Sequence, residues 1–243
     1  MPPVGPEPRR GTCRYDAGRA LRVRRMALHR FFESNNMLLQ RIQQQFIDSA
    51  DLKYQCAQSL APGVEAATTA VLVSVTGGGK VLACGNGASA SAASLFVASF
   101  LGRFERERPE LAAWSLCADA AVLTGIAQDF DGRATYARQV RALGQAGDVL
   151  LVLSLSGNSG NLLAAVEAAH ERDMTVVALT AGRGGRLAQM LRDTDVLIAV
   201  PHEQPARILE IHQLVLHCLC DGVDAQLLGL PDTTPLNETE NTP

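Results

Sequence analysis

The sequence predicts an α/β fold in which a parallel sheet carries helices on both faces. Short apolar runs, each ended by turn residues, alternate along the chain with helical patterns, an order typical of parallel sheets. The clearest run is Val149–Leu153, which has five apolar residues and no polar one. This composition is expected of a strand that is buried on both faces. A second run rich in β-branched residues, Thr175–Thr180, repeats the pattern.

Two helices are expected ahead of the first strand, with the folded region beginning near Met26. The second of them runs roughly from Leu60 to Thr76, with the Ala61-Pro62 pair marking its start. The first has apolar residues near helical spacing, namely Phe31, Phe32, Met37, Leu38, Ile42, Phe46 and Ile47. Two helices are more than are required to cover one edge of the sheet, so they are candidates for packing against another subunit.

The remaining elements follow in the alternating order. Strands are expected at Lys80–Cys84, Ala112–Cys117, Val149–Leu153, Thr175–Thr180 and Asp195–Val200. Helices are expected at Ala90–Phe104, Ala120–Ala127, Tyr136–Leu143, Leu187–Leu191 and Ala206–Leu228, and another begins at Leu162.

Polar residues follow two of these strands directly. Ser154, Ser156 and Ser159 stand with Gly157 and Asn158 between a strand end and a helix start. In an open α/β sheet, ligands bind at the edge where the carboxyl ends of the strands lie. A helix that starts at this edge offers the free N–H groups of its N-terminus to a phosphate. The pattern therefore favours a phosphate or phosphosugar pocket. A serine-rich helix cap without a ligand is the alternative.

A second polar loop, Gly85-Asn86-Gly87-Ala88-Ser89, follows the strand Lys80–Cys84. Its spacing differs from the dinucleotide-binding fingerprint, so by itself it is a weak signal. Paired with the serine loop, it gives two polar loops that could close over one phosphosugar.

Charge and cysteine usage limit the function classes. Residues 1–25 hold seven Arg and two acidic residues, which gives them a net charge of +5. Because the whole chain has a net charge of −3, the remaining residues carry −8. An acidic body does not suit direct nucleic-acid binding. The six cysteines lack zinc-finger spacing and are expected to be reduced thiols of a cytoplasmic protein. No apolar run is long enough to predict a membrane span.

The expected domains are a disordered basic extension at 1–25, one folded domain at 26–229 and a disordered tail at 230–243.

The paired motifs Cys-Gly-Asn-Gly-x-Ser and Ser-x-Ser-Gly-Asn-Ser resemble the sugar isomerase (SIS) domain family, phosphoheptose isomerase branch. The resemblance covers about residues 30–228 and implies a flavodoxin-like, five-stranded α/β fold that forms homotetramers. Within this branch, four further segments are most similar to the DnaA initiator-associating proteins, which are not enzymes. They begin at Arg103, Tyr136, Arg172 and Cys218. The resemblance implies a phosphosugar site made of Asn86, Gly87, Ser89, Asp129, Ser154, Ser156 and Ser159.

The sequence departs from the isomerase pattern at the zinc positions that the resemblance implies. Leu95 and Ser99 stand where the isomerases have a His ligand and a Glu that is both ligand and base. Leu209 replaces a Gln, and His217 alone matches its position, as acid and ligand. A leucine has no lone pair to offer a metal. We therefore expect no metal, no cofactor and no catalytic residue, with His217 a candidate only if the protein is an enzyme.

The expected function is thus a non-catalytic protein that binds the replication initiator DnaA and promotes its assembly at the chromosomal origin. Leu227 and Leu228 match a Leu-Phe pair that contacts DnaA in the initiator-associating proteins, and plain helix packing is the alternative. Two other functions stay open. One is phosphoheptose isomerase, which converts sedoheptulose 7-phosphate into D-glycero-D-manno-heptose 7-phosphate, and the other is a phosphosugar-sensing regulatory module. Fold alone does not choose among them.

Overall fold

The computed structural model describes residues 35–229. The predicted extension at 1–25, the start near Met26, the residues Phe31 and Phe32, and the tail at 230–243 lie outside this range. The chain divides into two compact units, Met1–Asp48 and Ser49–Pro243. The second unit contains the sheet.

One helix replaces the two that the sequence predicts before the first strand. Helix α2 runs from Asn35 to Thr76 and includes Pro62. The predicted break at Ala61-Pro62 is therefore wrong. Proline removes one backbone hydrogen bond of a helix, but residues on both sides of it are held by the core. Leu52, Cys56, Ala67 and Val71 are all buried, and packing of this kind overrides local propensity.

Helix α2 also qualifies, between Met37 and Thr76, as long and apolar enough to cross a membrane by length and composition alone. No uninterrupted apolar run in the sequence indicated this, because polar residues are spread through the segment. Core helices of soluble proteins meet the same criterion.

The sheet has five parallel strands in the order β2-β1-β3-β4-β5, which confirms the predicted fold class. In chain order the strands are β1 Val81–Gly85, β2 Ala113–Ser115, β3 Val149–Leu153, β4 Thr175–Ala181 and β5 Val196–Val200. The helices after α2 are α3 Ala88–Leu101, α4 Ala120–Asp129, α5 Ala134–Leu143, α6 Gly160–Glu171, α7 Gly185–Met190 and α8 Pro205–Leu228. Most bounds lie within a few residues of the predicted ones.

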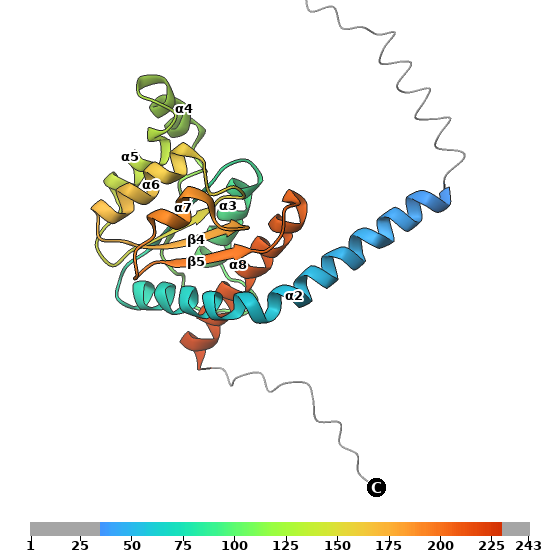
Figure 1. Cartoon of the computed structure of the whole chain (residues 1–243). Helices are drawn as coiled ribbons and strands as arrows, with labels where there is room; N and C mark the ends of the chain where they lie inside the picture. Colours follow the sequence, from blue (N-terminus) through green and yellow to red (C-terminus); the bar gives the residue numbers. More distant parts are fainter. Residues whose placement is uncertain (1–34, 230–243) are drawn as a thin grey trace, which may run out of the picture. The chain divides into compact units, whose positions relative to one another are not determined.

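Helices cover both faces of the sheet (Figure 1), and an apolar layer of buried side chains lies on each face. Alternate residues of each strand face opposite layers: Val81 and Ala83 pack with α3, α8 and the later part of α2, whereas Leu82 and Cys84 pack with α5, α6 and α7. All five residues of β3 are buried, as its apolar run predicted, and all five residues of β1 are buried as well. The central strands therefore hold the loops that follow them in fixed positions.

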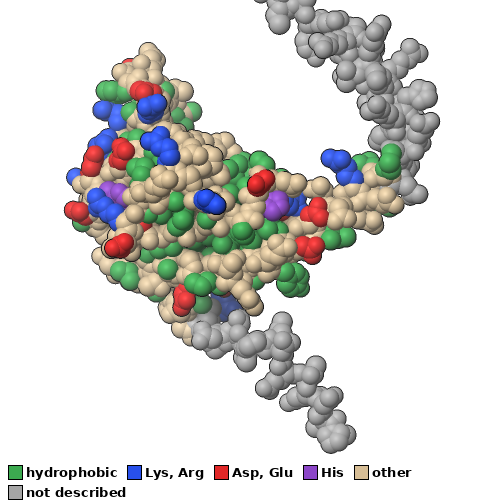
Figure 2. Space-filling model, in the orientation of Figure 1, with side chains coloured by type: hydrophobic (Ala, Val, Ile, Leu, Met, Phe, Trp, Pro, Cys, Tyr) green, Lys and Arg blue, Asp and Glu red, His purple; other side chains and the backbone are tan. Residues whose placement is uncertain are grey.

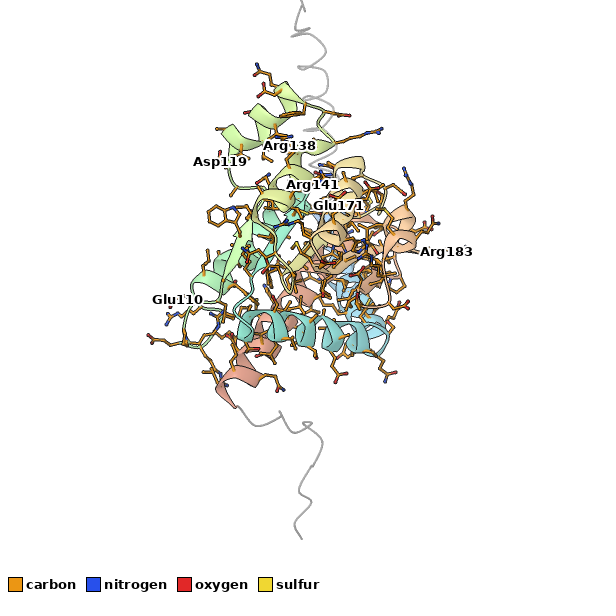
Figure 3. The ribbon with its side chains drawn as sticks, turned by 90° about the vertical axis from the view of Figure 1, so that its left-hand side faces the viewer. Glu110, Asp119, Arg138, Arg141, Glu171 and Arg183 are labelled. Carbon is orange, nitrogen blue, oxygen red and sulfur yellow. The ribbon has the colours of Figure 1, made fainter. Side chains whose placement is uncertain are left out.

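Charged side chains are confined mainly to the surface. Figure 2 shows Lys and Arg intermixed with Asp and Glu on the face drawn. Arg141 of α5 and Glu171 of α6 form an exposed ion pair with two hydrogen bonds, of 2.6 and 3.1 Å, and lie side by side in Figure 3. The pair joins two neighbouring helices of one layer.

Candidate phosphosugar site

The two polar loops meet at one pocket at the carboxyl edge of the sheet. Strands β1 and β3 are neighbours, and their last residues, Gly85 and Leu153, are paired in register. The loops that follow these strands therefore leave the sheet side by side. Together they enclose a pocket of about 170 Å³, here called the phosphosugar pocket. Its polar side chains are Asn86, Ser89, Ser154, Ser156 and Ser159, five of the seven residues predicted for the site.

The serine loop, residues 154–159, uses its hydroxyl groups in different ways. Buried Ser154 accepts a hydrogen bond from the Gly157 amide at 3.1 Å, so it shapes the loop. Ser156 accepts one from the Asn158 amide at 3.2 Å. Ser159 precedes α6 but makes no side-chain capping bond. A serine that served only as a helix cap would make that bond, so the structure does not support capping as the role of Ser159.

A tight backbone contact fixes the serine loop against the turn before α7. Gly157 has a φ of +63°, and a Cβ atom there would lie 1.9 Å from the carbonyl oxygen of Gly184. Only glycine fits such a contact. Asn158 adds two hydrogen bonds: its side chain donates to the Ser156 carbonyl at 2.8 Å and accepts from the Arg186 amide at 3.0 Å.

The Gly-Asn-Gly loop is held by residues that sequence reasoning did not assign to the site. Tyr136 donates a hydrogen bond of 2.6 Å from its hydroxyl to the Gly85 carbonyl. Burial raises the pKa of Tyr136, so this hydroxyl stays protonated and remains a donor. Asn161, in the first turn of α6, is hydrogen bonded to Asn86. Tyr136 stood in a segment quoted for the resemblance, but nothing in its spacing indicated this contact.

The other predicted residues do not line the pocket. Gly87, with a φ of +56°, caps the start of α3 and supplies conformation rather than a contact. Asp129 is the last residue of α4 and does not line the pocket. Exposed His217 lies on α8, where its ring contacts Gln213 at 2.7 Å. Leu227 and Leu228 end the same helix with exposed fractions of 38% and 40%.

The positions that the family resemblance assigns to zinc do not fit a zinc ion. Leu95 and Leu209 offer no donor atom, and the Ser99 hydroxyl donates to the Leu95 carbonyl at 3.1 Å. Within residues 35–229, no three His, Cys, Asp or Glu side chains are grouped as metal ligands. A catalytic zinc site needs three protein ligands of these types, so this donor set does not match.

The family model described as the SIS domain matches residues 45–181, more than half of the chain. The chain belongs to the SIS domain family. A phosphoheptose isomerase of Methylibium petroleiphilum is 59% identical over 198 residues, covering 82% of this chain and 99% of the relative. A second, from Azoarcus, is 51% identical over 195 residues, covering 80% of this chain and 99% of that relative.

Solved structures of two phosphoheptose isomerases share this SIS fold. The protein of Neisseria gonorrhoeae is 45% identical and gives a TM-score of 0.73, covering 77% of this chain and 99% of that chain. The protein of Francisella tularensis is 42% identical and gives a TM-score of 0.74, with coverage of 76% and 97%. The predicted fold and the predicted resemblance to the SIS domain family, phosphoheptose isomerase branch, are confirmed, whereas the closer similarity to the DnaA initiator-associating proteins is not shown.

These relatives correct the function predicted from the sequence. We expected a non-catalytic partner of DnaA, but the similar proteins and structures are phosphoheptose isomerases over nearly their whole length. The prediction was wrong because it gave three substituted positions, Leu95, Ser99 and Leu209, more weight than the rest of the chain. No comparison tests DnaA as a partner, and that contact stays a prediction.

Proposed function

We propose that this SIS domain protein is a phosphoheptose isomerase that binds a seven-carbon sugar phosphate in the phosphosugar pocket. The reaction is the interconversion of sedoheptulose 7-phosphate and D-glycero-D-manno-heptose 7-phosphate. The observation that carries the proposal is the 59% identity to an isomerase across 99% of that relative's length. The pocket adds physical support, because it offers the groups that a phosphate needs.

The serine loop is suited to the phosphate end of the substrate. Hydroxyl groups of Ser156 and Ser159 line the pocket, and the amide groups at the start of α6 follow them directly. A helix N-terminus carries a partial positive charge that stabilises an anion. A pocket of about 170 Å³ has room for a phosphate and little more, so the sugar extends beyond it. No step of the proposal involves zinc, because the donor set does not fit it.

The test is turnover of sedoheptulose 7-phosphate by the full-length protein, followed by NMR of the sugar. We expect product in the wild type and a loss of binding in the Ser156→Ala/Ser159→Ala variant, measured by calorimetry. The matched control is Ser91→Ala, an exposed serine on α3 that does not line the pocket. Binding and turnover that are unchanged in the double variant would remove the serine loop from the site.

A phosphosugar-sensing module is the second candidate function, and one observation favours it. Isomerisation needs a base to remove the proton beside the carbonyl, and Ser99 stands where the resemblance implies a Glu. A sensor would bind the sugar phosphate through the same serine loop without converting it. Saturable binding with no turnover would support the sensor and contradict the isomerase.

We also propose a homotetramer, located in the cytoplasm. Within the second unit, α2 and α8 border an apolar groove of about 770 Å³ that includes Leu60, Leu72 and Leu214. Within the first unit, α2 exposes six large apolar side chains: Met37, Leu38, Leu39, Ile42, Phe46 and Ile47. Apolar surface of this extent is typical of protein interfaces. Light scattering after gel filtration tests the assembly, and a monomer would contradict it.

A further inference from the structure

A second polar pocket lies next to the serine loop and includes Asn158 of that loop. It has a volume of about 460 Å³ and shares no lining residue with the phosphosugar pocket. Its polar side chains come from three segments: Arg133 before α5, Asn158, Asn161 and Glu167 from the serine loop and α6, and Arg186 in α7. We call it the arginine pocket.

Local packing places both arginines at this pocket. The Arg133 side chain lies over Gly160, where a Cβ atom would be 3.3 Å from its Nε atom and 3.4 Å from its Cγ atom. The absence of a side chain at Gly160 therefore leaves room for the Arg133 stem. Arg186 is positioned through its backbone, whose amide donates to the Asn158 side chain at 3.0 Å.

Neither guanidinium group is paired within residues 35–229, since neither forms a hydrogen bond or an ion pair there. Other arginines of the same layer are used by the fold: Arg141 pairs with Glu171, and Arg172 donates to the Gly144 carbonyl at 2.9 Å. Planar guanidinium groups bind phosphate through two parallel hydrogen bonds. Two of them at one polar pocket thus leave several donors available to an anion.

We propose that the arginine pocket binds a second ligand, a phosphorylated polyhydroxy compound. Its phosphate contacts Arg133 and Arg186. The carboxylate of Glu167, which forms no ion pair with either arginine, accepts hydrogen bonds from its hydroxyl groups. A volume of about 460 Å³ accommodates a sugar-sized molecule. This site does not depend on turnover in the phosphosugar pocket.

The test is calorimetric titration of the full-length protein with inorganic phosphate at low salt, where exposed charges are least screened. We expect two sites per chain in the wild type. Arg133→Gln/Arg186→Gln should weaken one of them by about tenfold or more, the effect of lost charge-assisted hydrogen bonds. Ser156→Ala/Ser159→Ala should remove the other. If the wild type shows a single site, and only Arg133→Gln/Arg186→Gln removes it, the result would support this proposal and contradict phosphate binding by the serine loop.

Arg106→Gln/Arg183→Gln is the matched control, because both arginines are exposed, line neither pocket and carry the same charge. Figure 3 shows Arg183 pointing into solvent. An equal loss of affinity in this control, or unchanged binding in Arg133→Gln/Arg186→Gln, would overturn the site. Ribose 5-phosphate should bind more tightly than inorganic phosphate, and Glu167→Gln should reduce that difference. Equal affinity for the two probes would overturn the polyhydroxy class.

Discussion

Asn86 and Asn161 exchange two hydrogen bonds between the Gly-Asn-Gly loop and the first turn of α6, which directly follows the serine loop. Each side chain donates to the carbonyl oxygen of the other, at 3.0 and 2.9 Å. The two residues are 75 positions apart in sequence. This exchange ties the Gly-Asn-Gly loop to the helix that begins where the serine loop ends.

The asparagine pair should act as a unit in ligand binding. Asn161 lines the arginine pocket and not the phosphosugar pocket, so binding of sedoheptulose 7-phosphate is measured in the Arg133→Gln/Arg186→Gln background. There, Asn161→Ala should weaken binding because Asn86 loses its partner. A calorimetric double-mutant cycle should give a coupling free energy of about 0.5–1.5 kcal/mol. Additive effects of the two single variants would show that the pair does not position the pocket.

Gly157→Ala should destabilise the protein. Its Cβ atom would meet the Gly184 carbonyl oxygen at 1.9 Å, and its φ of +63° already disfavours a side chain. We expect a loss of about 1–3 kcal/mol, as for other overpacked positions, and a lower melting temperature. Gly125→Ala is the control, because Gly125 lies inside α4 with nothing within 4 Å. That variant should gain up to about 1 kcal/mol from helix propensity.

Arg108 and Asp224 form a buried ion pair whose loss should be costly. Their side chains are 0% and 5% exposed, and Arg108 also donates to the Phe100 and Ser99 carbonyls at 3.0 and 2.9 Å. Asp224→Ala leaves a buried guanidinium without its counter-ion, which costs about 3–5 kcal/mol. Urea unfolding measures the loss. Arg141→Ala, which breaks the exposed pair with Glu171, should change stability far less.

Stability should fall on mild acidification because of His212. This side chain is fully buried, and burial lowers its pKa below the usual 6.5, partly opposed by its contact with the Thr180 carbonyl. Below pH 6.5 the unfolded chain binds a proton that the folded chain excludes, so stability is lost as the pH falls from 6.5 toward the folded pKa. The difference between the melting temperatures at pH 8 and pH 5.5 should be smaller in His212→Gln than in the wild type. If this difference is the same in the variant and the wild type, the loss of stability at low pH comes from titratable groups other than His212.

The sequence by itself determined the α/β class and the serine loop. The apolar run Val149–Leu153 has the composition of a strand buried on both faces, and it is one. Ser154, Ser156 and Ser159 follow it, so strand and loop are encoded in one continuous stretch. Local patterns of this kind depend only on neighbours along the chain, and a sequence displays them directly.

The tertiary structure decided which distant residues meet. Asn161 and Tyr136 reach the Gly-Asn-Gly loop only because β1 and β3 are neighbours in the sheet and α5 and α6 pack on one face of it. Helix α2 continues through Pro62 because residues on both sides of it are buried in the core. Contacts between segments far apart in sequence depend on strand order and packing, and neither local propensity nor residue spacing contains that information.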